Sequence, residues 1–427
     1  MFLQRGWIIL ILLILGWHEN AMATGDGVLE NPVYSAKFLG EGNAATADPF
    51  EPTAISYNPA GIAYLDGTQT EGTLFGVSGW AYVDQDTGSA RSGGSVIPIG
   101  TGYITQKLPD LQGTQVVCGV GMDSPFGLSK KSPSTFPAFS YTGFSGRLQM
   151  FTIKPTLAVK LNDSFSIGGG PVYNDILHYG AVAHYPNKLG VPVWPDGQAR
   201  MDLSGNKWSW QAGALYRLNE KNNVGLYFRG PVVVPLHGKI KVQNSVLLGD
   251  FETNANSKLQ LPLNLTLGYA FYPDKATALK LDLSYTRWST IENSIINGDP
   301  TGSLLDDAII AALGAANTNY LDAYSIAVGA SHDLNEKWTI RGGSFFVFSP
   351  VRENNFTPLI PDANRLAFSC GIGYKLTKDV AVDLGYGLAL NLTRTVSNSL
   401  TKTLGTSIDG DYFSMTHVIG VSVTMRK

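Results

Sequence analysis

The sequence predicts an all-β fold, an antiparallel transmembrane β-barrel, on three observations. Apolar residues alternate with polar or small ones over most of the chain after Gly67. The alternating runs approach the roughly 9–11 residues that a strand needs to cross a bilayer, whereas strands of soluble proteins peak near 5–6. Charged residues make up only 15% of the chain, yet no internal run of about 18 apolar residues predicts a spanning helix.

The first 23 residues are predicted to be a Sec-type signal peptide. Arg5 supplies the positive start, "WIILILLILGW" (7–17) is a short apolar run, and Ala21-Met22-Ala23 is a cleavage site of the small-x-small kind. The alternative, an uncleaved anchor helix, is disfavoured because the run is shorter than the roughly 17–25 residues of a span. Export and barrel-type strands together predict a multi-pass protein of the outer membrane of a Gram-negative bacterium.

Residues 68–427 are predicted to form the barrel. In "LKLDLSYTRW", Leu279 and Leu283 share one face while Lys280 and Asp282 share the other. A soluble sandwich would place the polar face in water, and a membrane barrel would place it in the lumen. Counting such runs gives fourteen strands, which begin near Gly72, Ser95, Thr114, Arg147, Asp163, Asn206, Asn223, Lys258, Ala278, Asp322, Trp338, Asn364, Val380 and Asp411.

The connections between these runs are of two kinds. Short polar turns, "KLNDS", "LNEKN", "YPDKA", "LNEKW" and "LTKDV", alternate with long loops, as the periplasmic and extracellular ends of bacterial barrels do. Aromatic residues near strand ends are expected to form a girdle at the membrane surface. They are Tyr272, Trp288, Trp338 and Tyr374.

Two long loops are the candidates for recognition. The loop at 124–146 carries Phe136, Phe139, Tyr141 and Phe144, and the loop at 299–321 carries the apolar stretch "LLDDAIIAALGAA". Apolar residues exposed in loops usually contact something apolar, so these aromatic residues are candidate substrate contacts. The alternative is that the loops pack on each other over the barrel mouth.

The sequence carries no recognisable catalytic or cofactor motif. It lacks the H-E-x-x-H, G-x-S-x-G and Walker patterns, and a net charge of −3 without basic blocks argues against nucleic acid. No metal, no cofactor and no enzymatic activity are expected. Lys280, Asp282 and Asp383 are expected to be solvated lumenal charges. Cys118 and Cys370 are expected to face lipid as unpaired thiols, a single disulfide being the alternative.

Several stretches, in order along nearly the whole mature chain, resemble the FadL/TodX (OMPP1) family of outer-membrane transporters for long-chain fatty acids and other hydrophobic compounds. The front "SAKFLGEGNAATADPFEPTAISYNPAGIAYLDG" resembles the family's N-terminal signature, and "GVGMDSPFGL" its third strand. The most specific stretches are "DAYSIAVGASHDLNEKWTIRGGSFFVFSPV" and "IPDANRLAFSCGIGYKLTKDVAVDLGYG".

The resemblance implies a fourteen-stranded barrel whose lumen is plugged by an N-terminal hatch of short helices and turns, at residues 24–67. It also implies capture of substrate among the loops, binding in a lumenal pocket, movement of the hatch, and lateral exit through a gap at a bend in the third strand. The matching residues are Asn58, Pro59, Ala60 and Gly61 for the hatch, and Asp123, Ser124, Pro125, Phe126 and Gly127 for the gate.

Physical arguments support both assignments. Asn58 tolerates turn geometry and Pro59 presets φ, so the two residues fix a turn. Gly61 is expected to leave room for the backbone to approach the wall. Pro125 has no N–H for the ladder, so strand pairing must lapse there.

The expected partners are a hydrophobic small molecule and outer-membrane lipid, both lipopolysaccharide and phospholipid; the protein is expected to be a monomer. Leu321 stands where the resemblance leads us to expect a lysine for a fatty-acid carboxylate. His178, His184, Lys188 or Arg200 could substitute, and a neutral hydrocarbon or aromatic substrate stays open. Two alternatives are a barrel esterase or lipase using Ser414 and His417, and a general porin.

Overall fold

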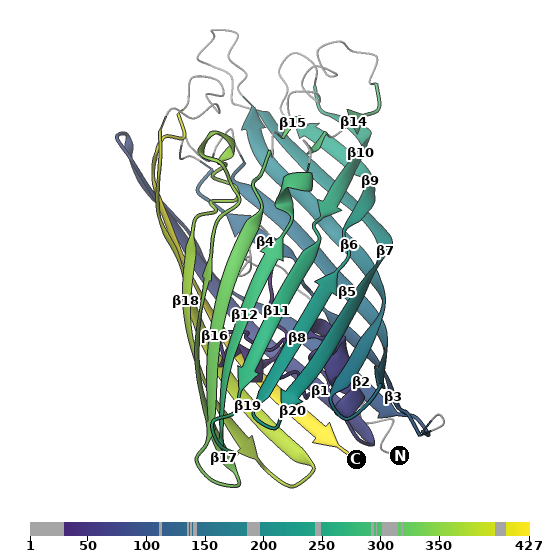
Figure 1. Ribbon diagram of the computed structural model, residues 1–427. Coiled ribbons are helices and arrows are strands. Elements are labelled where there is room, and N and C mark those ends of the chain that lie inside the picture. Colours follow the sequence, from purple (N-terminus) through teal and green to yellow (C-terminus); the bar gives the residue numbers. More distant parts are fainter. Residues whose placement is uncertain are drawn as a thin grey trace.

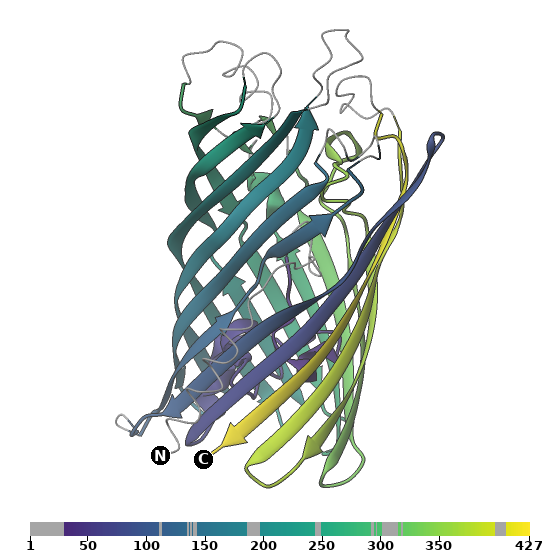
Figure 2. The ribbon, with the colours of Figure 1, turned by 180° about the vertical axis from the view of Figure 1, so that it is seen from behind.

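A computed structural model of the chain describes residues 30–110, 113–134, 136, 139, 143–185, 197–243, 249–291, 294–295, 297–300, 315–316, 319–397 and 407–427 (Figure 1). Within these ranges, fourteen staves form a closed antiparallel barrel, a stave being one full crossing of the wall. The barrel closes where β1 (Thr68–Gln85) pairs with β20 (Gly410–Arg426), from Gln69↔Arg426 to Asp84↔Asp411. Figure 2 shows these two strands side by side.

Most staves are single strands. Besides β1 and β20, they are β2 (Gly88–Lys107), β5 (Ser145–Lys160), β6 (Phe165–Tyr185), β7 (Gly197–Asn219), β12 (Thr277–Thr286), β16 (Ala323–Asp333), β17 (Trp338–Val347), β18 (Arg365–Lys375) and β19 (Val380–Val396). Three staves each consist of two strands separated by a break: β3 (Gln115–Asp123) and β4 (Gly127–Lys131), β8 (Asn222–Arg229) and β9 (Val232–Gln243), and β10 (Phe251–Leu261) and β11 (Asn264–Phe271).

The remaining elements of the barrel are small. They are β13 (Ser294–Ile295), β14 (Asn297–Gly298), β15 (Ala315–Ala316), and the 3-10 turns η2 (Trp288–Thr290) and η3 (Glu353–Asn355). No helix among the described residues is long and apolar enough to cross a membrane.

The fourteen predicted strands are confirmed, since each predicted start falls on, or within two residues of, a separate stave. Three starts were placed late, by about seven residues at Ser95 and Lys258 and nine at Asn206 (observed at Gly88, Phe251 and Gly197). The reason is visible in the start of β10, "FETNANS", where both faces are largely polar and apolar alternation gives no signal.

The predicted division into faces is also correct. Leu279 and Leu283 on β12 are each 44% exposed, as residues on the outer face of the barrel should be, whereas Lys280 and Asp282 are buried in the interior. Cys118 and Cys370 are both unpaired thiols, as predicted.

The five short turns connect the staves at one end of the barrel, the end at which the C-terminus lies (Figure 1). Asn or Asp side chains stabilise them: Asn162 accepts the N–H of Ser164 at 2.9 Å, and Asn335 accepts the N–H of Lys337 at 2.9 Å. The polar composition that marked these segments as turns therefore has a direct structural role.

The predicted aromatic girdle is half right. Trp338 is 40% exposed and stacks on Tyr374, with ring centroids 4.4 Å apart. Trp288 is instead buried, because η2 follows directly after Arg287 and ends the straight course of the strand. Tyr272 is also misassigned, since its hydroxyl donates to Asp48 in the lumen at 2.6 Å. The predicted signal peptide, Lys188, Tyr141 and residues 304–314 lie outside the described residues.

Candidate functional site

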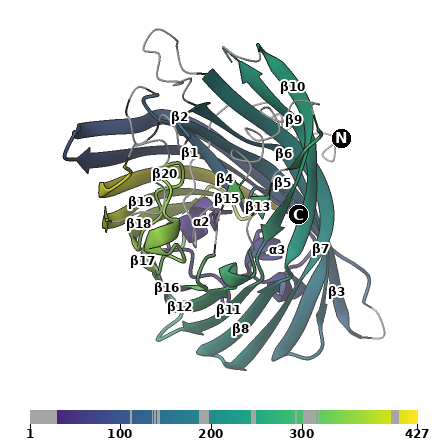
Figure 3. The same ribbon diagram turned by 90° about the horizontal axis from the view of Figure 1, so that it is seen from above.

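Residues 30–67 form a lumenal segment, which lies inside the ring of strands in the view from above (Figure 3). It contains three short helices, α2 (Ala36–Leu39), α3 (Ala54–Tyr57) and η1 (Pro59–Tyr64). Phe38, Ile55 and Ile62 have no exposed surface and belong to one apolar cluster. This part of the lumen is therefore filled with protein, which differs from the open channel that a general porin requires.

Asn58 joins two parts of the lumenal segment to the wall. Its amide nitrogen donates to the carbonyls of Thr46 at 2.8 Å and of Ala214, on β7, at 3.0 Å. Its amide oxygen accepts the N–H of Ala60 at 3.2 Å and so caps η1, whose first residue is Pro59. Asn58 therefore does more than form a turn.

The close approach between the segment and the wall depends on glycines of the wall. A Cβ atom on Gly213 would lie 2.0 Å from Asn58 Oδ1, and one on Gly168 would lie 2.5 Å from the Pro59 oxygen. The predicted role of Gly61 is wrong in this respect. A Cβ there would lie 2.2 Å from the oxygen of Pro49, so Gly61 makes room within the segment itself.

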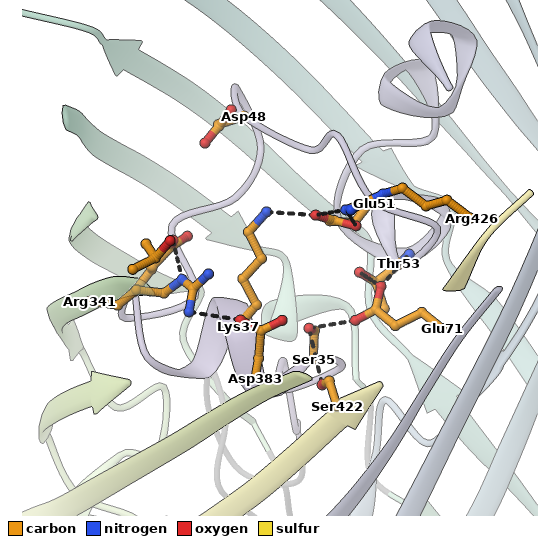
Figure 4. Close-up of polar contacts among 12 residues, drawn as sticks. Ser35, Lys37, Asp48, Glu51, Thr53, Glu71, Arg341, Asp383, Ser422 and Arg426 are labelled. Atoms are coloured by element: carbon orange, nitrogen blue, oxygen red, sulfur yellow. Dashed lines mark hydrogen bonds and ion pairs between the residues drawn. The ribbon is translucent and has the colours of Figure 1, made fainter. Parts of the chain in front are cut away.

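The strands at the barrel seam bind the beginnings of α2 and α3 (Figure 4). Glu71 on β1 accepts the hydroxyl of Ser35 at 2.7 Å and that of Thr53 at 2.9 Å. Ser422 on β20 accepts the N–H of Ala36 at 2.8 Å. These contacts satisfy polar groups that short, uncapped helices would otherwise leave unpaired.

An ion-pair group continues this contact. Glu51 accepts from Lys37 at 2.9 Å and from Arg426, on β20, at 3.1 Å (Figure 4). Burial disfavours the ionised carboxylate, but Lys37 and Arg426 outweigh that effect and lower the pKa of Glu51. Glu51 thus links α2 to the last strand of the barrel.

A second ion-pair group holds the loop between α2 and α3. Lys280 on β12 contacts Glu41 at 2.7 Å and Asp48 at 2.5 Å. Arg341 on β17 contacts Glu41 at 3.1 Å and Asp383, on β19, at 2.8 Å. Burial opposes ionisation of Asp48, but Lys280 and Lys37 outweigh it and lower the pKa.

The prediction that Lys280, Asp282 and Asp383 are solvated lumenal charges is therefore wrong. All three are at most 6% exposed, because the lumenal segment covers them. Asp282 accepts the N–H groups of Ala45 and Thr46, each at 3.0 Å, so even this carboxylate is a docking point for the segment.

The third stave is interrupted at the residues predicted to form the gate. β3 pairs with β5 up to Asp123↔Thr152, and β4 resumes at Gly127↔Gln149, so residues 124–126 face only two residues of β5. Ser124 leaves the ladder and donates its hydroxyl to the carbonyl of Met150 at 2.8 Å. The ladder between β2 and β3 ends at Gly102↔Met122, although β2 extends to Gly88.

The first described residues of the chain cross this break. The N–H of Asn31 donates to the carbonyl of Pro125 at 2.7 Å, and Glu30 forms an antiparallel bridge with Phe126. The Glu30 carboxylate also pairs with Arg229, at the end of β8. The start of the lumenal segment therefore supplies backbone pairing where the wall itself lacks it.

A buried polar cluster connects α3 to the same break. Asp123, the last residue of β3, accepts hydrogen bonds from Lys154 at 2.7 Å, Tyr103 at 2.9 Å and Thr152 at 2.6 Å. Ser56 on α3 also donates to Asp123 and accepts from Lys154 at 2.9 Å. A movement of α3 would therefore disturb the residue at which the stave breaks off.

The upper lumen holds a large apolar cluster beneath the long loops. It includes Phe126, Trp288 and Phe139, and Phe136 and Phe144 pack against it. Phe139 is 2% exposed, so this loop residue packs inward in the way that the loop-packing alternative predicts. A role in capture stays a prediction.

Of the basic residues suggested for a carboxylate, two lie on exposed parts of the wall: His178 pairs with Asp202 at 3.2 Å with both side chains well exposed, and Arg200 is exposed. His184 lies at the edge of this cluster, because its ring contacts Phe144 at a centroid distance of 4.7 Å. Reasoning from the sequence missed Arg229 as a candidate functional residue. Arg229 lies an even number of positions after Asn223 on the same strand, so both side chains face inward, and it directly precedes Gly230-Pro231. Both features can be read from the sequence.

The residues proposed for an esterase are not arranged for catalysis. Ser414 accepts from Asn391 at 2.8 Å, and His417 Nδ1 lies 2.8 Å from the hydroxyl of Tyr386. Three residues apart on one strand, Ser414 and His417 project to opposite faces of the wall. Among the described residues, no group of three or more His, Cys, Asp or Glu side chains is placed to hold a metal ion.

Residues 34–426 match the model of a family described as outer membrane protein transport protein (OMPP1/FadL/TodX). The long-chain fatty acid transport protein of Escherichia coli O6:H1 is 26% identical over an alignment of 426 residues, covering 86% of this chain and 90% of that protein. Its counterpart in Salmonella typhi is 25% identical with the same coverage, 86% and 90%.

Two solved structures show the same fold. A Pseudomonas aeruginosa FadL homologue has a TM-score of 0.79 at 16% identity, covering 93% of this chain and 99% of that one. The P. putida toluene transporter TodX has a TM-score of 0.69 at 16% identity, covering 94% and 99%.

Proposed function

Because this chain belongs to the outer membrane protein transport family (OMPP1/FadL/TodX), we propose that it is a passive outer-membrane transporter of hydrophobic compounds. One relative is a long-chain fatty acid transport protein and one structural neighbour is a toluene transporter. Long-chain fatty acids or hydrocarbons are therefore the proposed substrates. The protein works as a monomer in contact with lipopolysaccharide and phospholipid.

The route begins at the long loops and the apolar cluster below them. Phe136 and Phe144 are only partly buried, and they border the fully buried Phe139 and Trp288. An apolar molecule that separates the loops would exchange contacts with water for contacts with these rings, which is favourable in proportion to the apolar area buried. Tyr141 is retained as a proposed substrate contact on the basis of the sequence alone.

The lumenal segment acts as the hatch of this route, with residues 24–67 as its extent. The observation that carries the proposal is the position of Glu30 and Asn31 across the break in the third stave, bonded to Phe126 and Pro125. When this start of the segment withdraws, residues 123–127 lose a partner that closes the wall. Asn58, Pro59, Ala60 and Gly61 hold the rest of the hatch in place.

Exit is lateral, through the wall between β2 and β4. Residues 88–101 of β2 form no ladder with the third stave, because the β2–β3 pairing stops at Gly102. Release at this level delivers an apolar molecule to lipid rather than to water, so no aqueous transfer step is needed. Asp123, Ser124, Pro125, Phe126 and Gly127 are the gate residues.

Uptake measurements test this function. Cells that lack the gene, with or without a plasmid copy, are given radiolabelled palmitate and, separately, toluene. The plasmid should restore uptake of at least one of them, and a variant lacking residues 30–35 should no longer close the break in the third stave. Equal uptake of both compounds with and without the gene would refute transport as the function.

A further inference from the structure

An open cavity lies inside the ring of strands at the short-turn end of the barrel. Its volume is about 300 Å³, whereas one water molecule needs roughly 10–15 Å³. Six residues line it: Phe50, Tyr64 and Leu65 from the lumenal segment, and Gln69, Arg217 and Arg426 from the wall. None of the proposed capture and gate residues is among them, so this cavity is separate from the proposed route of the substrate.

The two arginines reach the cavity from strands that are not neighbours in the wall. Arg217 lies near the end of β7, and Arg426 is the last residue of β20. Arg217 has the inward parity of Gln211, and its guanidinium lies 5.2 Å from the centroid of the Tyr64 ring. Arg426 is held by Glu51, whose two carboxylate oxygens each accept from Nη2 at 3.1 Å (Figure 4). The two side chains therefore meet the end of the lumenal segment from two parts of the barrel.

The charges around the cavity favour an anion. Its walls carry two guanidinium groups and no carboxylate. Arg426 has Glu51 as a partner, and nearby Lys160 is paired with Asp163 at 2.8 Å, whereas Arg217 forms no ion pair among the described residues. The planar guanidinium group donates two parallel hydrogen bonds to the oxygens of a phosphate or a carboxylate. An oxyanion is therefore the natural partner of Arg217.

Two polar atoms in the walls have no hydrogen-bond partner among the described residues. They are the hydroxyl oxygen of Tyr64 and the amide oxygen of Gln69, a residue that is only 6% exposed. The amide nitrogen of Gln69 donates to the carbonyl of Asp66 at 3.1 Å, so the amide oxygen is left as a fixed acceptor. A buried polar atom without a partner is costly. A ligand that satisfies Gln69 must therefore carry a donor besides its anionic group.

The aromatic wall of the cavity has a fixed shape. The Phe50 and Tyr64 rings meet edge to face at a centroid distance of 5.6 Å, and the guanidinium of Arg217 covers the Tyr64 ring. The carbonyl of Leu65 accepts from Gln115, at the start of β3, at 3.3 Å. Because the walls are already ordered, little conformational entropy is lost when a small molecule binds between them.

We propose that this cavity binds a small, water-soluble phosphate monoester that carries a hydroxyl group, of the kind represented by glycerol 3-phosphate. A phosphate monoester has a charge of about −1.5 to −2 at neutral pH and three terminal oxygens, which suffice for Arg217, Arg426 and the Tyr64 hydroxyl. The hydroxyl group of the ligand donates to Gln69. A bound ester thus joins β7 and β20 to the end of the lumenal segment.

The test compares glycerol 3-phosphate with methyl phosphate, which has the same phosphate group and no hydroxyl. Dissociation constants are measured by titration calorimetry on the purified full-length protein, in a non-ionic detergent and a phosphate-free buffer of constant ionic strength. The wild-type protein should bind glycerol 3-phosphate about fivefold more tightly than methyl phosphate, as expected for one additional hydrogen bond.

Three variants assign the binding to this cavity. Arg217→Gln should weaken the binding of both esters about tenfold or more, because a charge-assisted hydrogen bond is lost. Gln69→Leu should weaken only glycerol 3-phosphate, about fivefold, so that the two esters bind alike. Arg287→Gln replaces an exposed arginine outside the cavity and should change neither affinity. A heat-modifiable band on gels confirms that each variant has a folded barrel.

Two results would overturn the inference. One is the absence of measurable binding of glycerol 3-phosphate to the wild-type protein at millimolar concentration. The other is an equal loss of affinity in Arg217→Gln and Arg287→Gln, which would reduce the effect to general attraction between charges. Neither measurement involves uptake, so a failure of the proposed transport function would leave both results unchanged.

Discussion

The lumenal segment meets the wall in two different ways. Its middle part, residues 35–58, is held mainly by buried side chains from continuous staves, such as Glu71 on β1 and Lys280 on β12. One further contact, from Ser56 to Asp123, reaches the edge of the break. Its start, residues 30–31, bonds to backbone atoms of Pro125 and Phe126, which lie in a break of the third stave. The two parts of the segment therefore differ mainly in the region of the wall that they contact.

This contrast assigns different roles to the two regions. Displacement of the middle part would expose ion pairs and leave several charges without partners in a closed space, which is expensive. Displacement of the start would break one buried ion pair, between Glu30 and Arg229, and would otherwise separate it from a wall region that has already lost regular pairing. The first region therefore anchors the lumenal segment, and the second is the part that we expect to move.

The largest effect should come from breaking the anchor. Lys280→Ala removes the ammonium group between Glu41 and Asp48, and loss of one partner of a buried ion pair typically costs about 3–5 kcal/mol. Hydrogen exchange at residues 36–57 should increase strongly. Lys239→Ala, which breaks an exposed pair with Glu252, should change the stability by less than about 1 kcal/mol. Unchanged protection in Lys280→Ala would mean that these pairs do not anchor the segment.

A smaller effect is expected at Asn58. Asn58→Ala leaves the carbonyls of Thr46 and Ala214 without their donor and uncaps η1, at a cost of about 1–3 kcal/mol. The barrel should still fold, as judged by a heat-modifiable band on gels, while conductance in planar bilayers rises. Asn162→Ala, in a short turn, is the control and should not change conductance. Reduced stability without altered conductance would mean that Asn58 contributes only to the stability of the turn.

The anchor should also weaken in acid. Burial opposes the ionisation of Glu51 and Asp48, but neighbouring cations outweigh it, so both pKa values are lower in the folded protein than in the unfolded chain. Their stabilising effect is complete above the unfolded values, near pH 4, and is lost as the pH falls through the folded ones. The protection of residues 36–57 from hydrogen exchange, corrected for the intrinsic exchange rate at each pH, should be constant from about pH 7 to 5 and decrease below about pH 4. Glu51→Gln should flatten this dependence; a transition near neutral pH would contradict it.

The smallest effect is expected from Pro125→Ala. The missing N–H of Pro125 is one reason for the break, but three residues of the third stave also face only two of β5. Ser124 keeps its bond to Met150, so restoring one N–H should not restore the ladder. Uptake should stay within about twofold of the wild type. Abolished uptake would show that the proline alone keeps the gate open to lipid.

Much of the barrel could be predicted because the alternation of side chains along a strand shows, from the local sequence alone, which residues share a face. Alternation in "LKLDLSYTRW" correctly separated the outward-facing Leu279 from the inward-facing Lys280, and the polar turns marked the stave boundaries. The break at residues 124–126 was predicted as well. Its physical basis was only partly Pro125, since the mismatch with β5 cannot be seen in one strand.

The contacts of the segment could not be predicted in the same way. Parity shows that Lys280 faces inward, but not that Glu41, 239 positions earlier, will meet it there. The prediction that the lumenal charges are solvated was therefore wrong. The prediction that Trp288 belongs to the aromatic girdle was wrong because a turn after Arg287 redirects the chain. Arg229 was detectable from its parity, and only its pairing with Glu30 required the fold.

Transport should require that the start of the lumenal segment leaves the break in the third stave. Glu30 and Phe126 are antiparallel partners, and such pairs have the Cα separation that a disulfide requires. A Glu30→Cys/Phe126→Cys variant, made with Cys118→Ser and Cys370→Ser, can therefore be locked and unlocked. Oxidation should abolish palmitate uptake, and reduction of the same protein should restore it. Undiminished uptake by the oxidised, verified disulfide form would show that the start of the segment need not leave the break.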